Sequence, residues 1–177
     1  NQRVSLGRND LLIRTFLSAA QATDHSATLD ISGTVTADTL ECTVYTQASV
    51  TLTGKADEMI NPGMNATSPT NVPFTIGSND PSNPNACVGK IAIQLHGTAD
   101  SAYDDVLAND DVSEMGAKGV AIGVYDGINN TPLPINGSQL TPGTPSGSFG
   151  LQLVALNGQT VTAGNVHSAI TLDIVRL

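Results

Sequence analysis

Residues 27–36 read A-T-L-D-I-S-G-T-V-T, with apolar side chains at every second position except one. That repeat sets three branched residues on one face with a glycine between them: Leu29, Ile31, Gly33 and Val35. Successive side chains of a β-strand point to opposite faces, so a period of two residues predicts a strand with one buried face. This segment near the N-terminus is therefore expected to be a half-buried strand.

The same alternation recurs along the rest of the chain. The last ten residues, S-A-I-T-L-D-I-V-R-L, carry it at Ile170, Leu172 and Ile174. Further alternating runs fall at residues 42–52, 72–76, 88–97, 119–125 and 149–156. Stretches rich in Gly, Pro and Asn separate these runs, and such spacing predicts seven or eight short strands in an antiparallel sandwich. Only residues 9–22 and 101–115 are candidates for a helical turn or two.

Composition excludes several classes of function. The chain has 177 residues, enough for one domain with a sizeable core, and 40% of them are hydrophobic. Its net charge of −9 disfavours nucleic acid as a partner, because an acidic surface repels phosphates. Charged residues make up only 13%, which leaves little charge to oppose close self-association. Aromatic residues reach only 3%, which disfavours a lectin-like sugar site.

The two cysteines, Cys42 and Cys87, have no CxxC spacing and no cluster of histidines beside them. One disulfide formed in an oxidising compartment is the simplest interpretation, and two buried free thiols in a cytosolic protein are the alternative. A bridge closing a loop of about 45 residues would contribute roughly 4 kcal/mol by the chain-entropy model.

No catalytic motif is present in the sequence. The GxSxG, HExxH, P-loop and GxGxxG patterns are all missing, so no enzymatic activity and no cofactor are expected. Two acidic pairs could suggest calcium ligands, but without an EF-hand pattern they indicate a solvated loop: Asp104, Asp105, Asp110 and Asp111. His96 and His167 are isolated in the sequence, and we expect both at the surface.

Residues 1–23 are treated as an N-terminal extension or leader, and residues 24–177 as the folded domain. Within the extension, L-L-I-R-T-F-L-S-A-A-Q-A (11–22) resembles the tail of a signal peptide, yet Arg14 interrupts its apolar part. Part of it, residues 11–17, is also a candidate for a second donor-like strand. No stretch reaches the roughly 20 apolar residues of a membrane span.

Five segments together resemble pilin subunits of the chaperone–usher, type 1-like fimbrial family. They are TLDISGTV (28–35) followed by Cys42, VPFTIGSND (72–80) leading to Cys87, IAIQLHGTAD (91–100) followed by VLAN, GAKGVAIGVYDGINNTPLPIN (116–136), and VTAGNVHSAITLDIV (161–175). Their order and spacing follow the family over residues 24–177. The chain departs from the family at Arg176, where a penultimate aromatic residue is common.

The resemblance implies an immunoglobulin-like sandwich that lacks its last strand and is completed by a strand donated from a neighbouring subunit. It implies that Leu29, Ile31, Gly33 and Val35 are the donor residues, with Gly33 where the groove admits no side chain. The acceptor groove would then lie along a C-terminal strand carrying Ile170, Leu172 and Ile174. Cys42 and Cys87 would form the structural disulfide.

These implications predict a structural subunit of a surface fibre that polymerises by donor-strand exchange. Its expected partners are identical or related pilin subunits, with a periplasmic chaperone and an outer-membrane usher acting during assembly. Its expected location is the cell surface, reached through the periplasm. A fimbrial tip adhesin or carbohydrate-binding domain is the alternative, and a β-sandwich hydrolase is a more distant one.

Overall fold

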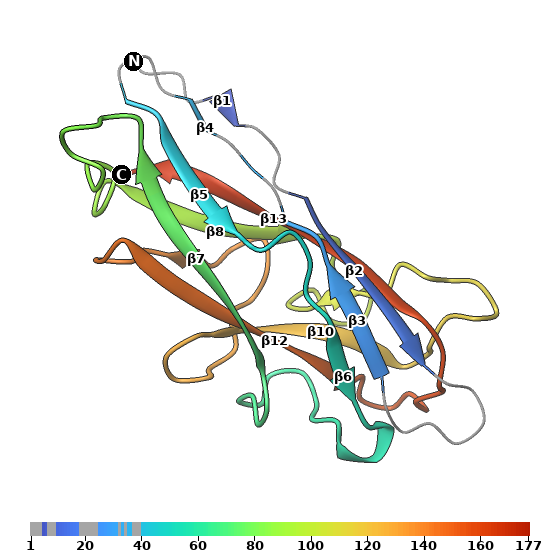
Figure 1. The fold of residues 1–177 in the computed structure, drawn as a ribbon. Coiled ribbons are helices and arrows are strands. Elements are labelled where there is room, and N and C mark those ends of the chain that lie inside the picture. The colour runs from blue at the N-terminus through green and yellow to red at the C-terminus, as the bar shows by residue number, and fades with distance from the viewer. Residues whose placement is uncertain (1–4, 7–9, 18–24, 32, 34, 37–39) are drawn as a thin grey trace.

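The chain folds into two antiparallel β-sheets that pack face to face (Figure 1). The structure, a computed structural model, describes residues 5–6, 10–17, 25–31, 33, 35–36 and 40–177, and it describes side chains from Leu40 onward and for a few residues before it. The strands are β1 (Ser5–Leu6), β2 (Asp10–Leu17), β3 (His25–Leu29), β4 (Val35–Thr36), β5 (Cys42–Thr46), β6 (Leu52–Gly54), β7 (Thr70–Ser78), β8 (Ile91–Gly97), β9 (Leu107–Ala108), β10 (Val120–Asp126), β11 (Gln139–Leu140), β12 (Ser146–Ala155) and β13 (Val166–Arg176). The predicted all-β sandwich is confirmed.

Seven strands form the first sheet, in the order β1-β4-β5-β7-β12-β10-β9. Six form the second, in the order β11-β8-β13-β2-β3-β6. The chain therefore crosses between the sheets several times, and β5 and β6, which follow each other in sequence, belong to different sheets. The crossings from β7 to β8, from β10 to β11 and from β12 to β13 are rich in Gly, Pro and Asn, as the sequence predicts, whereas residues 47–51 between β5 and β6 contain none of these.

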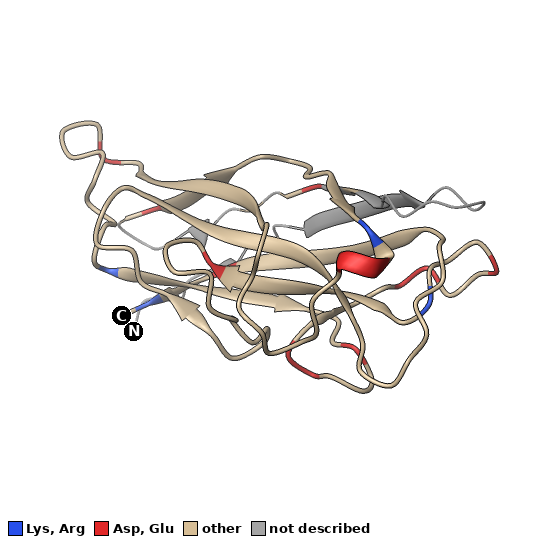
Figure 2. Cartoon of the chain, turned by 90° about the horizontal axis from the view of Figure 1, so that it is seen from below, with Lys and Arg blue, Asp and Glu red and all other residues tan. Residues whose placement is uncertain are grey.

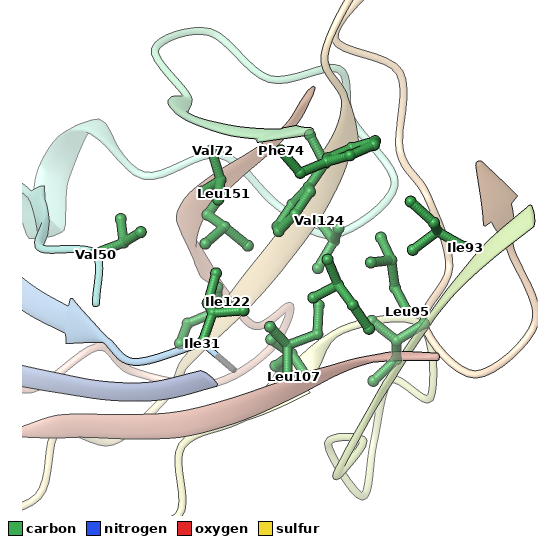
Figure 3. Close-up of a cluster of buried hydrophobic side chains, with 14 of the residues drawn as sticks. Ile31, Val50, Val72, Phe74, Ile93, Leu95, Leu107, Ile122, Val124 and Leu151 are labelled. Carbon is green, nitrogen blue, oxygen red and sulfur yellow. The ribbon is translucent and has the colours of Figure 1, made fainter. Parts of the chain in front are cut away.

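Alternating buried positions in several strands contribute to the core. In β13 the residues Val166, Ser168, Ile170, Leu172 and Ile174 are buried, while the residues between them are half-buried. In β7 the same repeat buries Val72, Phe74 and Ile76. These rows meet between the two sheets in one contiguous cluster, part of which is shown in Figure 3. Its centre includes Leu107, Ile122 and Leu151, whose side chains are completely or almost completely buried.

Neither expected helical segment is helical in its described residues, and residue 9 of the first lies outside them. Residues 10–17 of the first candidate, 9–22, form β2, and residues 18–22 lie outside the described part of the chain. The second candidate, 101–115, contains turns and the short strand β9. The one helical element in the described residues is a 3-10 turn, η1 (Ala56–Glu58). Local sequence left residues 10–17 ambiguous, and pairing with strands on both sides decides their conformation.

Charged side chains lie mainly in the loops. Figure 2 shows Asp and Glu residues in the connections and in η1, while most of the strand surface carries no charge. No helix in the described residues is long and apolar enough to cross a membrane.

Candidate subunit-binding groove

The second sheet is completed by strands that precede Cys42 in the sequence. In that sheet, β2 and β3 lie between β13 on one side and β6 on the other. Without them, β13 would keep β8 as its only strand partner, and β6 would lose the only strand with which it pairs in the described structure. The space between β13 and β6 is therefore a groove that one or two added strands must fill. We refer to it below as the completion groove.

Backbone pairing within the completion groove is antiparallel throughout. β2 pairs with β13 from Val166↔Thr15 to Thr171↔Asp10, and with β3 from Ile13↔Leu29 to Leu17↔His25. The next strand, β3, pairs with β6 through Ala27↔Leu52. These ladders satisfy the backbone N–H and C=O groups that an open sheet edge would expose.

β2 covers only the first half of the β13 edge. Its pairing with β13 ends at Thr171, whereas β8 pairs with the other edge of β13 as far as Arg176. Within the described residues, no strand pairs with Leu172–Arg176 on the β2 side. Within the described part of the chain, the C-terminal half of β13 thus pairs along one edge only.

The walls and floor of the completion groove are apolar. Ile170, Leu172 and Ile174 of β13 are buried, as are Val50 and Leu52 next to and within β6. Ile122 and Val124 belong to the same cluster and come from β10 in the opposite sheet. Ser168 interrupts this apolar row and is the one buried polar residue among the described residues.

The predicted donor segment, 27–36, is folded against its own domain. Ala27 and Ile31 are buried, and Ile31 joins the core cluster that also contains Ile122, as Figure 3 shows. Leu29 ends β3, where its backbone pairs with Ile13. Gly33 is half-buried, and Val35 in β4 pairs with Cys42. The alternation predicts one continuous strand, but the described residues of the segment belong to β3 and β4, with Asp30, Ile31 and Gly33 outside both strands.

The predicted disulfide between Cys42 and Cys87 is confirmed. Cys42 is the first residue of β5, and Cys87 lies in the turn-rich segment that precedes β8, with 5.9 Å between the two Cα atoms. Both residues are buried. The bridge ties the end of the N-terminal segment to the middle of the chain.

The polar clusters outside the groove stabilise loops. His167 lies at the start of β13, and its Nδ1 bonds to the Asp110 carboxylate at 2.5 Å. Asp111 accepts hydrogen bonds from the backbone and hydroxyl of Ser113, and these lower the pKa of its carboxyl group. His96 lies in β8 with its Nε2 3.3 Å from the Asp173 carboxylate.

Asp104, Asp105, Asp110 and Asp111 lie in loops, as the sequence predicts. The described residues contain no group of three or more His, Cys, Asp or Glu side chains placed to hold a metal ion.

One open hollow lies away from the completion groove, between the turn after β10 and the segment joining β11 to β12. It has a volume of about 610 Å³ and includes the fully exposed side chain of Ile128. Asp126 is the single ionisable group among the described residues that line it. The Asp126 carboxylate accepts hydrogen bonds from the amides of Ile128 and Asn129, so its role there is to order the turn.

Comparison with known proteins identifies the family. The profile of the fimbrial protein family matches residues 29–174, and the chain belongs to that family. Similar solved structures include two pilus or fimbria proteins. The P pilus rod subunit PapA is 14% identical, with 77% of this chain and 91% of that chain covered and a TM-score of 0.47. The type I fimbria protein and antigen BPSL1626 of Burkholderia pseudomallei is 18% identical, with 97% of both chains covered and a TM-score of 0.46. A search of curated proteins found no match.

The family match makes this chain a fimbrial protein, that is, a subunit of a surface pilus that associates with other pilin subunits. The matched region begins at Leu29, inside β3, and ends at Ile174, close to the end of β13. It therefore includes both sides of the completion groove.

Proposed function

We propose that this protein is a non-enzymatic building block of a chaperone–usher fimbria, and that its copies are joined by exchange of the N-terminal segment. In the fibre, residues 27–36 of one copy occupy the completion groove of the next. Leu29, Ile31 and Val35 are the side chains that enter that groove, and Gly33 is the position where no side chain fits. Ile170, Leu172 and Ile174 form the receiving wall.

The observation that carries this proposal is the origin of the strands in the completion groove. Both β2 and β3 come from residues before Cys42, as do the two-residue strands β1 and β4 of the first sheet, whereas every other strand of the sandwich begins at Cys42 or later. A segment that completes a sheet can be exchanged for a segment of a second copy, because backbone pairing along a strand edge does not depend on which chain supplies the strand. In this proposal, residues 27–36 of the second copy take the place beside β13 that β2 holds in the structure.

The energetics favour a long-lived joint. Each branched side chain that becomes buried contributes roughly 1.5–3 kcal/mol before entropy costs. Strand pairing also satisfies the backbone groups along β13, which would be costly to bury unpaired. Until a neighbouring segment arrives, an open apolar groove would aggregate, and for this reason we include a periplasmic chaperone and an outer-membrane usher among the partners. The route to the cell surface would then pass through the periplasm.

Gel mobility of the isolated protein before and after boiling in SDS tests this function. We expect a ladder of large species in the unboiled sample that collapses to one band near 18.2 kDa on heating. Such a ladder requires subunits held by a slow-opening noncovalent joint. A single monomer band in both lanes, obtained from assembled surface material, would contradict strand exchange.

A further inference from the structure

Residues Leu40–Cys42, where the N-terminal segment joins β5, are held by three separate parts of the folded domain. The Arg176 guanidinium donates a hydrogen bond from Nη2 to the Leu40 carbonyl oxygen at 2.6 Å. The backbone of Glu41 exchanges two hydrogen bonds with Asn79: its N–H donates to Oδ1 at 3.0 Å, and its C=O accepts from the Asn79 N–H at 3.1 Å. The next residue, Cys42, is bonded to Cys87.

These three holding residues come from different elements. Arg176 ends β13, Asn79 follows β7, and Cys87 precedes β8, so the contacts reach Leu40–Cys42 from both sheets. The Leu40 side chain also packs against the core cluster. A charged donor such as guanidinium makes a stronger hydrogen bond than a neutral group. The chain is therefore fixed at this point independently of any strand that lies in the completion groove.

We propose that Leu40–Cys42 is a fixed root for the N-terminal segment, and that Arg176 and Asn79 are its positioning residues. The root limits strand exchange to residues before Leu40 and keeps β5 in place when the segment leaves for the groove of a second copy. This inference rests on the proposed strand exchange, and it adds the point at which exchange stops. The side-chain hydrogen bonds of Arg176 and Asn79 given above both go to the root, and through these bonds the two residues act on exchange.

Hydrogen exchange measured by mass spectrometry on the full chain tests the root. In the wild type, peptides covering residues 25–36 should exchange by local opening, whereas peptides covering 40–46 should exchange only with global unfolding. In Arg176→Gln and in Asn79→Ala, we expect residues 40–46 to exchange about tenfold faster, as loss of a hydrogen bond of ordinary strength predicts. Arg176→Lys, which keeps a cationic donor, should restore slow exchange.

Lys90→Gln is the matched control. Lys90 lies next to the end of β13, where its carbonyl accepts from the Leu177 N–H, and its substitution removes the same charge as Arg176→Gln. This control should show the wild-type pattern. A variant with Arg176→Gln whose residues 40–46 exchange at the wild-type rate would overturn the root. If Arg176→Gln does not fold, Asn79→Ala serves instead: wild-type exchange rates of residues 40–46 in that variant would equally overturn the proposed root.

Failure of strand exchange itself has a different signature. In that case the wild type would give no SDS-resistant ladder, although the slow exchange of residues 40–46 would remain.

Discussion

The hydroxyl of Tyr125 lies over Gly123 on the same face of β10, so closely that a Cβ added at Gly123 would come within 2.3 Å of the hydroxyl oxygen. Glycine at this position gives the phenol ring its place beside the strand. The ring is almost completely buried in a second, smaller cluster with Val106, Val154 and Leu156. Burial disfavours the phenolate and raises the pKa of Tyr125 to about 12.

Tyr125 should therefore make the protein less stable in alkali. Its pKa in the folded state lies above the value of about 10 for an unfolded chain, so the neutral ring stabilises the fold fully below about pH 10. This contribution is lost as the pH rises from about 10 through 12. We expect Tyr125→Phe to show a smaller fall in the free energy of unfolding over that range, measured by denaturant titration. The matched control is Tyr45→Phe, which changes an exposed ring. If the free energy of unfolding fell equally with pH in both variants, the alkaline loss of stability would not come from Tyr125.

Shortening a side chain in the receiving wall should weaken both the domain and the fibre. Ile170→Ala removes buried methyl groups beside the completion groove, and such changes cost about 2–5 kcal/mol in the free energy of unfolding. We expect its SDS-resistant ladder to collapse at a lower temperature than that of the wild type. Ile128→Ala, at a fully exposed side chain, should change neither quantity measurably. If the ladder of Ile170→Ala collapsed at the same temperature as that of the wild type, Ile170 would not be part of the completion groove.

A side chain at Gly33 should block assembly. If residues 27–36 enter the groove of a neighbouring copy in the proposed register, Gly33→Leu places a bulky group where none fits. We expect this variant to remain soluble with its chaperone and to form no ladder. Gly137→Leu is the control, because a Cβ at Gly137 meets no atom within 4 Å. Normal fibres from Gly33→Leu would show that the register is shifted.

Removing the disulfide should destabilise the domain substantially. Its residues are 45 positions apart, and loss of a native bridge closing a loop of that size costs about 2–5 kcal/mol. We expect Cys42→Ser/Cys87→Ser to unfold at a correspondingly lower denaturant concentration. Thiol labelling of the denatured, non-reduced wild type should detect no free cysteine, and a labelled product would disprove the bridge in the mature protein.

The sandwich could be predicted because a strand with one buried face has apolar residues at every second position, and this alternation is visible in the sequence. The alternation at Ile170, Leu172 and Ile174 correctly placed these side chains in the core. Residues 10–17 gave no such record: D-L-L-I-R-T-F-L has neighbouring apolar residues and a central Arg14, and it becomes a strand through its two neighbours in the sheet.

The root of the N-terminal segment could not be predicted at all. Arg176 and Leu40 are 136 positions apart, and an arginine at the end of a strand does not indicate which carbonyl it will bind. Resemblance to the family gave no help here either, since the family commonly has an aromatic residue at this position. Only the three-dimensional arrangement brings the two residues together.

The disulfide at the start of β5 also decides how a fibre would carry mechanical load. If copies are joined through their N-terminal segments, tension along the fibre enters each domain at Cys42. The covalent bond passes that force directly to Cys87, between β7 and β8, so it does not act on the hydrogen bonds of β5 one after another. A pulling force would then act on β5 and on the segment leading into β8, which belong to different sheets. Both sheets would have to separate at once, which requires more force than breaking the hydrogen bonds of one strand in sequence.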